Sequence, residues 1–190
     1  MITRVVVASK NPHKVVEVVA VLARVLPGLQ VAEGLDWPDI PETGSTLEEN
    51  ALIKARAVVE FTGHAAVADD TGLEVDALGG APGVWSSRYA GEGATYAENR
   101  RSLLAAMTGQ TDRAARFRTV VALFTPGEEP ITVAGTLEGR ITEAERGRSG
   151  FGYDPIFEVD GRTLAELSEE EKNAISHRAR ALEALAARLA

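Results

Sequence analysis

The stretch TLEENALIKARAVVEFTGHAAVADDTG, residues 46–72, decides the fold class of this 190-residue chain. It opens with a capping-box pattern, in which the side chains of Thr46 and Glu49 satisfy the first backbone N–H groups of a helix. Good helix formers continue over Leu47–Phe61, and a glycine follows as a stop signal. The apolar run Ala65–Asp69 then predicts a buried strand. A capped helix that leads directly into a buried strand is typical of an α/β protein.

The same alternation continues on both sides of this stretch. We expect further helices at Val15–Val25, from Thr95 to about Met107, for a turn after Ser168, and at His177–Leu189. We expect strands at Thr3–Ala8, near Val31, and at Arg116–Thr125, Ile131–Leu137 and Ile156–Val159. The turn PGEE predicts an antiparallel hairpin, whereas the glycine-rich segment LEVDALGGAPGVWSSRYAG is expected to be largely loop. The chain is therefore predicted to be a single α/β domain, residues 1–190, with a mixed sheet.

Composition excludes several classes of protein. The net charge of −8 argues against a nucleic-acid partner, which requires a positive footprint. The chain has no cysteine, which excludes disulfides and cysteine-based zinc sites. No apolar run is long enough for a membrane span, and the N-terminal run is too short for a signal peptide. We therefore expect a cytoplasmic protein that contacts neither membrane nor nucleic acid.

The first candidate site is the loop SKNPHK. Its residues are Ser9, Lys10, Asn11, Pro12, His13 and Lys14. It joins a buried strand to a helix, so its backbone N–H groups and the helix N-terminus are placed to face an anion. The glycine-lysine pattern of a P-loop is absent. A surface turn with solvated lysines fits the spacing equally well.

The second candidate site is the acidic stretch ADDTG. Carboxylates are the hard oxygen ligands that Mg²⁺ takes together with substrate phosphates. If strand geometry continues through them, Asp69 and Asp70 point to opposite faces and do not form a close acid pair. The alternative is a polar strand end at which Asp69 caps a turn. Glu42 is a further candidate ligand and Lys54 lies on the following helix, although each taken alone is an ordinary exposed side chain.

A third set combines aromatic and donor side chains. It comprises Phe151, Gly152, Tyr153, Asp154, Lys172, His177 and Arg178. Aromatic rings between glycines can stack on a base, and lysine, histidine and arginine donate hydrogen bonds that the O6 of a purine accepts. Spacing alone fits aromatic core packing beside ordinary surface charges better than it fits a base site.

Taken together, five segments resemble the inosine triphosphate pyrophosphatase family. They are SKNPHK, TLEENALIKARA, ADDTGLEVDALGGAPGVWSSRYAG, SGFGYDPIF and LSEEEKNAISHRARAL, and they follow the family's order over nearly the whole chain. The resemblance implies hydrolysis of the purine nucleoside triphosphates ITP, dITP and XTP to the monophosphate and pyrophosphate, with Mg²⁺. It also implies an elongated two-lobed α/β fold around a mixed, twisted sheet with flanking helices, a nucleotide cleft between the lobes, and a homodimer.

The resemblance also implies roles by position. Asp70 matches the catalytic acid and metal ligand, and Glu42 matches a second metal-associated acid. The substrate-contacting positions that match are Ser9, Lys10, Asn11, Pro12, His13 and Lys14 for the triphosphate, then Lys54, Thr71 and Arg88. The base-contacting positions that match are Phe151, Gly152, Tyr153, Asp154, Lys172, His177 and Arg178.

The chain departs from the family pattern at Ser9-Lys10-Asn11, where many members carry Thr-Gly-Asn or Thr-Asn-Asn, and at His13, where a glycine is usual. Two other classes of function are weighed against the pyrophosphatase. A non-catalytic nucleotide-binding regulator should have lost an acid or lysine from the cluster, which this chain has not. An aspartyl-phosphate phosphatase commonly spaces its acids as D-x-D, whereas Asp69 and Asp70 are adjacent.

Overall fold

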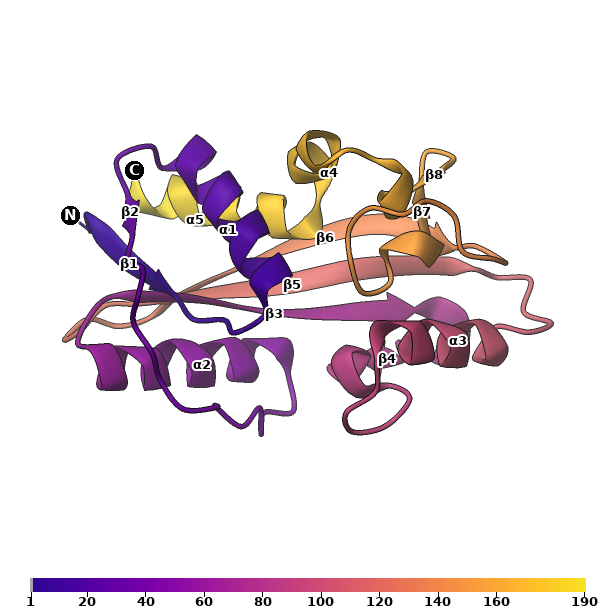
Figure 1. Cartoon of the computed structure of the whole chain (residues 1–190), viewed down its shortest axis with the longest axis horizontal. Coiled ribbons are helices and arrows are strands. Elements are labelled where there is room, and N and C mark those ends of the chain that lie inside the picture. The colour runs from indigo at the N-terminus through magenta and orange to yellow at the C-terminus, as the bar shows by residue number, and fades with distance from the viewer. Residues whose placement is uncertain (1) are drawn as a thin grey trace. The chain divides into compact units, whose positions relative to one another are not determined.

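The computed structural model describes residues 2–190, and Figure 1 shows its helices and strands. The chain divides into two compact units. Unit 1 contains the chain up to Asp70 together with Thr119–Gly135 and His177–Ala190, and unit 2 contains Thr71–Arg118 and Thr136–Ser176. None of the helices in residues 2–190 is both long enough and apolar enough to cross a membrane.

The described residues form an eight-stranded sheet in the order β2-β1-β3-β5-β6-β7-β8, with β4 paired to β3. The strands are β1 (Arg4–Val7), β2 (Gln30–Val31), β3 (Ala66–Val75), β4 (Pro82–Gly83), β5 (Ala114–Phe124), β6 (Ile131–Ile141), β7 (Phe157–Val159) and β8 (Arg162–Thr163). Strand β1 pairs in parallel with β2 and β3. Pairing is antiparallel for β3 with β4, for β6 with β7 and for β7 with β8. The predicted α/β class and mixed sheet are confirmed.

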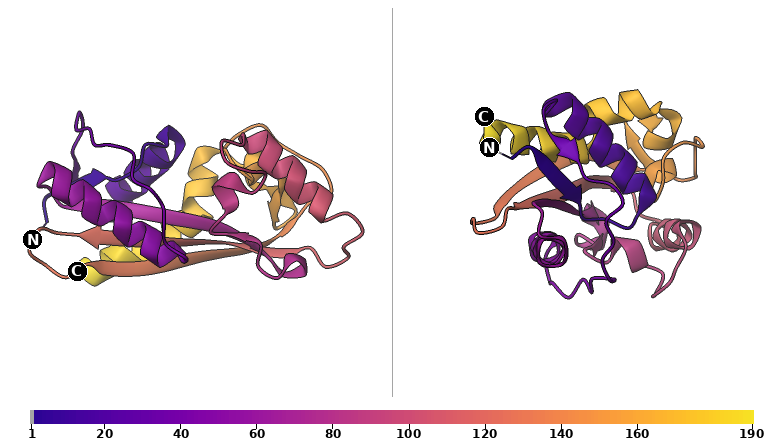
Figure 2. Two further views of the ribbon diagram at one scale, coloured as in Figure 1. Left: turned by 90° about the horizontal axis from the view of Figure 1, so that it is seen from below. Right: turned by 60° about the vertical axis from the view of Figure 1, so that its left-hand side comes forward.

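Unit 1 contains the helices α1 (Pro12–Val25), α2 (Leu47–Thr62) and α5 (His177–Leu189). Helices α1 and α5 pack together on one face of the sheet, and α2 covers the other face (Figure 2). The core under α1 and α5 joins Val5 and Val7 of β1 to Leu22 and Leu182. Both faces of β1 and β3 are therefore buried, which explains the continuous apolar runs of their sequences.

Unit 2 contains α3 (Tyr96–Ala106), α4 (Glu169–Ile175) and several short 3₁₀ turns. Its core gathers Leu73, Leu103, Met107 and Phe157 among others. The capping boxes that open α2, α3 and α4 all form as predicted. A fourth, at Thr163 in unit 2, was not foreseen.

Several predicted boundaries are wrong; β6, for example, was expected to end at Leu137 and runs to Ile141. Helix α1 begins at Pro12 rather than at Val15, because Asn11 caps it and a proline at the first helical position loses no hydrogen bond. Strand β3 runs to Val75, although the strand was expected to end at Asp69 and the segment from Leu73 onward to be largely loop. Strand β4 pairs with this extension, and a Cβ on Gly72 would lie only 2.7 Å from the carbonyl oxygen of Gly83. Close backbone approach at glycine thus extends the strand.

Candidate active site

Asp70 lies within β3 at the centre of a buried charged cluster in unit 1. The Nζ of Lys54 donates to Asp70 Oδ1 at 2.8 Å and to Glu42 Oε1 at 2.9 Å. Asn50 Nδ2 donates to the second oxygen, Asp70 Oδ2, at 3.3 Å. Asp70 is only 6% exposed and Lys54 is 8% exposed. The structure thus brings together three of the predicted residues and adds Asn50, which had not been predicted.

Helix α2 positions this cluster. Asn50 and Lys54 are four residues apart, so they lie on the same helix face, the one turned toward Asp70. The side chain of Asn50 also accepts from the backbone N–H of Gly44 at 2.8 Å, which ties the loop carrying Glu42 to the helix. The i, i+4 spacing of Asn50 to Lys54 was the sequence signal that could have identified Asn50.

The charges of the cluster depend on each other. Burial raises the pKa of Asp70, and the ammonium groups of Lys54 and Lys14 offset only part of this effect. Burial disfavours the charged form of Lys54, but the carboxylates of Asp70 and Glu42 outweigh it and raise the pKa of Lys54. Lys54 therefore remains an ammonium group at neutral pH, held by two acids.

The cluster also suits a divalent cation. Oxygens of Asp70 and Glu42 lie 2.8 Å and 2.9 Å from the same cationic atom, Lys54 Nζ, and carboxylate oxygens are the ligands that Mg²⁺ prefers. Within residues 2–190 no group of three or more histidine, aspartate or glutamate side chains forms a ready-made metal cage. The two acids therefore fit a metal ion whose coordination shell is completed by substrate phosphates and water.

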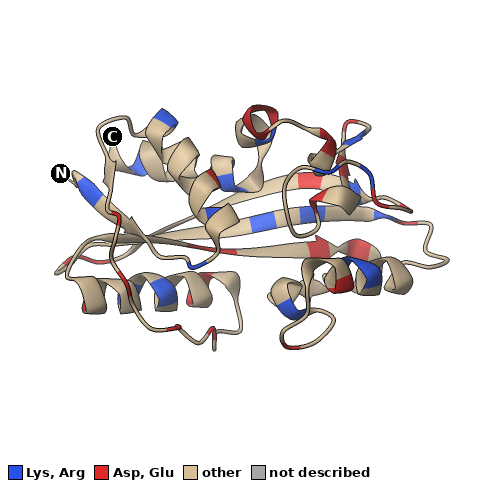
Figure 3. Cartoon of the chain, viewed as in Figure 1, with Lys and Arg blue, Asp and Glu red and all other residues tan. Residues whose placement is uncertain are grey.

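Asp69 faces the opposite side of β3, toward α1 and α5. Its Oδ2 lies 3.2 Å from Lys14 Nζ and 3.2 Å from Arg178 Nη2. The other terminal nitrogen of Arg178, Nη1, donates to Glu17. Figure 3 shows acidic positions on β3 and basic positions on α1 and α2. The prediction that the two aspartates face opposite sides of the strand is confirmed.

The buried ion pairs around Asp69 shift the pKa values of their members. Burial alone would raise the pKa of Asp69, but Lys14 and Arg178 outweigh it and hold the pKa far below its usual range. Burial lowers the pKa of Lys14, and the attraction of Asp69 offsets part of this shift. Asp69 is therefore ionised at any physiological pH.

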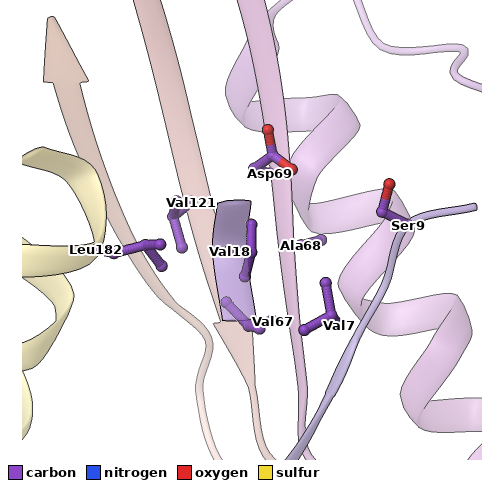
Figure 4. A pocket seen from close by; sticks show the side chains of 8 residues that line it. All are labelled: Val7, Ser9, Val18, Val67, Ala68, Asp69, Val121 and Leu182. Carbon is purple, nitrogen blue, oxygen red and sulfur yellow. The ribbon is translucent and has the colours of Figure 1, made fainter. Parts of the chain in front are cut away.

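A narrow pocket adjoins Asp69 in unit 1 (Figure 4). It is lined by Val7, Ser9, Val18, Val67, Ala68, Asp69, Val121 and Leu182. The side chains of Ser9 and Asp69 carry the oxygens of an otherwise apolar lining. The pocket is too narrow to admit a water molecule, so it is a packing defect beside the ion pairs rather than a ligand site.

The predicted phosphate loop is partly organised by its own side chains. Asn11 Oδ1 accepts from the backbone N–H of His13 at 3.0 Å, which caps α1. Lys10 forms an ion pair with the exposed Asp39 at 3.0 Å. Lys14 points inward to Asp69, so it contributes positive charge inside unit 1. Pro12 opens the helix.

The residues predicted to contact the base belong to both units. Phe151, Asp154 and Lys172 lie together in unit 2: Asp154 Oδ2 accepts from Lys172 Nζ at 2.5 Å and from Phe151 N at 2.8 Å. Lys172 Nζ also lies 4.8 Å from the centre of the Phe151 ring. His177 and Arg178 instead open α5 in unit 1, where both are buried.

The remaining predicted residues lie in unit 2. Arg88 stacks over the ring of Trp85, with the guanidinium carbon 4.6 Å from the ring centre. The hydroxyl of Tyr153 donates to the carbonyl of Ser86 at 2.8 Å, and burial raises the pKa of this phenol. Gly152 lies beside Tyr153 with a positive φ of 60°. Thr71 is the first residue of the unit.

Comparison with known proteins agrees with this architecture. A family model described as the Ham1 family matches residues 5–188. The dITP/XTP pyrophosphatase of Bacillus licheniformis is 50% identical over 192 residues, which cover 97% of each chain. A solved HAM1 protein from Coxiella burnetii superposes with a TM-score of 0.87 at 46% identity, covering 100% of this chain and 98% of the other. The Ham1 protein of Staphylococcus aureus gives a TM-score of 0.86 at 40% identity, covering 98% and 97%. The chain therefore belongs to the Ham1 family.

Proposed function

We propose that this chain hydrolyses non-canonical purine nucleoside triphosphates, namely dITP, ITP and XTP, to the nucleoside monophosphate and pyrophosphate, and so removes them from the nucleotide pool. The observation that carries the proposal is the cluster of the buried Asp70 and Lys54 with the partly exposed Glu42, found in a chain that is 50% identical to a dITP/XTP pyrophosphatase. A buried acid with a raised pKa beside a paired lysine is a common feature of catalytic sites.

In the proposed mechanism, Asp70 orients the attacking water and accepts its proton. The oxygen of the water forms a new bond to phosphorus, and the bond that joins the α- and β-phosphates breaks. Lys54 stabilises the negative charge that develops on the phosphate oxygens, because its ammonium is already fixed in place by two acids. Asn50 holds the second oxygen of Asp70 so that the first faces Lys54.

The proposal includes Mg²⁺ as cofactor, held by Asp70 and Glu42. When bound, the ion would neutralise phosphate charge and make the attacking water more acidic. The carboxylate of an unperturbed aspartate is a weak base, since its pKa is ordinarily about 3.9. Burial raises that pKa and so makes Asp70 a better proton acceptor.

The phosphate and base contacts extend the proposal. We place the triphosphate on the loop Ser9–Lys14, whose Lys14 supplies buried positive charge. We assign Lys54, Thr71 and Arg88 to further substrate contacts. We assign the base to Phe151, Gly152, Tyr153, Asp154, Lys172, His177 and Arg178. An adenine amino group offers no acceptor to the N–H groups of these side chains that face the base. Each such lost hydrogen bond costs about 1–3 kcal/mol, which would discriminate against ATP.

Location and assembly complete the proposal. We propose that residues 1–190 work as one pyrophosphatase domain in a cytoplasmic homodimer, without a nucleic-acid or membrane partner. Size-exclusion chromatography with light scattering tests the dimer, whose expected mass is twice the chain mass of 20.2 kDa.

The function is tested by a pyrophosphate-release assay on dITP, XTP, ITP, GTP and ATP. We expect the first three to be hydrolysed fastest with Mg²⁺, and no turnover in chelator. Equal rates on ATP and dITP would contradict the selectivity, and full activity in chelator would contradict the metal requirement. Release of orthophosphate alone would contradict the reaction type.

A further inference from the structure

Two adjacent residues of helix α3, Asn99 and Arg100, have roles that the proposed reaction does not explain. Both belong to unit 2, and neither was predicted to contact substrate. Asn99 is only 2% exposed, and the side chain of Arg100 is 15% exposed. A buried amide and a nearly buried guanidinium in the middle of a helix must be satisfied by hydrogen bonds, so their partners indicate what they hold.

Asn99 fixes the segment that carries Arg88. Its Oδ1 accepts from the backbone N–H of Ala90 at 2.8 Å, and its Nδ2 donates to the carbonyl of Ser87 at 2.9 Å. One amide group therefore holds the backbone immediately before and two residues after Arg88. Because the partners are main-chain groups, this contact fixes the course of the segment rather than one side chain.

Arg100 fixes the glycine loop that carries Phe151. A terminal nitrogen of Arg100 donates to the carbonyl of Gly152 at 2.9 Å, while its Nε lies 2.9 Å from Glu145. One helical turn earlier, the ring of Tyr96 packs against the ring of Phe151 with 5.9 Å between their centres. Residues four apart share one helix face, so Tyr96 and Arg100 act on the loop together.

The glycine loop needs such anchors. Gly150 and Gly152 both have a positive φ, at 71° and 60°. Glycine has the largest backbone freedom, so ordering this loop costs more conformational entropy than ordering a loop of other residues. A loop that is already ordered does not incur this cost when a ligand binds, which strengthens binding.

The two anchored segments are also joined to each other. The hydroxyl of Tyr153 donates to the carbonyl of Ser86 at 2.8 Å. The side chain of Ser86 in turn accepts from the backbone N–H of Leu73 at 2.8 Å. The segment of Arg88, the glycine loop and helix α3 are therefore connected by contacts of buried or nearly buried side chains.

We infer that Asn99 and Arg100 are positioning residues for substrate recognition: they hold the Arg88 segment and the Phe151–Asp154 loop ready for the nucleoside end of the substrate. This inference rests on the proposed function. It concerns the nucleoside contacts that belong to unit 2, whereas Asp70 and Lys54 of unit 1 act on the phosphates.

The test compares Arg100→Met with Arg101→Met, an exposed arginine on the same helix. We expect Arg100→Met to raise the KM for dITP by about tenfold, equivalent to about 1.4 kcal/mol, and to change kcat much less. Inorganic tripolyphosphate, which carries no base, should inhibit the variant and the wild type with the same Ki. Arg101→Met should match the wild type in both measurements, and Arg100→Lys should recover part of the lost affinity.

Other results contradict the inference. An unchanged KM for dITP in Arg100→Met removes the positioning role. Equal losses toward dITP and tripolyphosphate show general damage to the fold and also reject it. If Arg100→Met does not fold, the KM for dITP and the Ki for tripolyphosphate are measured in Arg100→Lys and Asn99→Asp instead. Wild-type values in both variants would reject the inference.

The failure of the proposed function would look different, because the wild type itself would then release no pyrophosphate. In that case hydrogen exchange at residues 150–154 still tests the anchoring by Arg100. We expect faster exchange in Arg100→Met than in Arg101→Met, and equal exchange would reject the anchoring.

Discussion

Asp69 and Asp70 are neighbours in the chain, but their carboxylates lie in two separate ion networks on opposite faces of strand β3. Asp69 contacts Lys14 and Arg178, whereas Asp70 contacts Lys54 and Asn50. The environments also shift the two pKa values in opposite directions, downward for Asp69 and upward for Asp70. The two acids are therefore expected to respond differently to the same substitution.

Asp70→Asn should abolish most turnover while the protein stays folded. The amide keeps the shape of the side chain but cannot accept a proton, and loss of a general base typically lowers the rate by about 10²–10⁴-fold. Pyrophosphate release measures kcat, and circular dichroism checks the fold. Near wild-type turnover would remove Asp70 from the catalytic role.

Asp69→Asn should instead destabilise the protein. It removes the negative charge between the buried Arg178 and the largely buried Lys14, and breaking a buried ion pair typically costs about 3–5 kcal/mol. Urea unfolding at neutral pH measures the loss in free energy of unfolding. A variant as stable as the wild type would show that Lys14 and Arg178 are satisfied without Asp69.

The ion network of Asp69 predicts how stability changes with pH. The folded-state pKa of Asp69 is depressed, so its contribution to stability is fully present above the unfolded pKa, which is about 3.9. That contribution is lost as the pH falls below this value toward the folded pKa. Urea unfolding from pH 7 to pH 3 should therefore show a smaller loss of stability in Asp69→Asn than in the wild type, and parallel curves would contradict this assignment.

Lys54→Met should shift the acid side of the activity profile. Lys54 lowers the pKa of Asp70, so its removal raises that pKa, and ionised Asp70 is then lost at a higher pH than in the wild type. The pH dependence of kcat/KM at fixed Mg²⁺ measures the shift, and kcat should also fall. Arg56→Met is the control. Arg56 lies on the same helix, and its guanidinium lies over the ring of Phe124. Its removal should leave the pH dependence of kcat/KM unchanged.

Gly135→Ala should destabilise unit 1. A Cβ at this position would lie 2.2 Å from the carbonyl oxygen of His177 and 2.4 Å from the nitrogen of Ala181, so α5 would have to move away from β6. Overpacking of this kind typically costs about 1–3 kcal/mol. Gly28→Ala is the matched control, because a Cβ there meets nothing within 4 Å. Equal melting temperatures for the two variants would contradict the prediction.

Much of the fold could be predicted because its signals are local. The capping pairs that begin at Thr46, Thr95 and Ser168 act over three residues, and each opens a helix at the expected place. The C-terminal boundary of β3 could not be predicted in this way, because its last residues pair with other strands, among them β4. That pairing depends on the close approach of Gly72 to Gly83, which no short pattern specifies.

The sequence by itself determined that Asp69 and Asp70 point apart, because side chains alternate along any strand. Only the tertiary structure decided their partners. Arg178 lies 109 residues after Asp69 in the chain, and Lys54 lies 16 residues before Asp70. The sequence also grouped Arg178 with Phe151 as a base contact, and the structure shows that its guanidinium binds Asp69 and Glu17. The physical reason is that a buried charge must be paired, and which opposite charge reaches it depends on how the helices pack on the sheet.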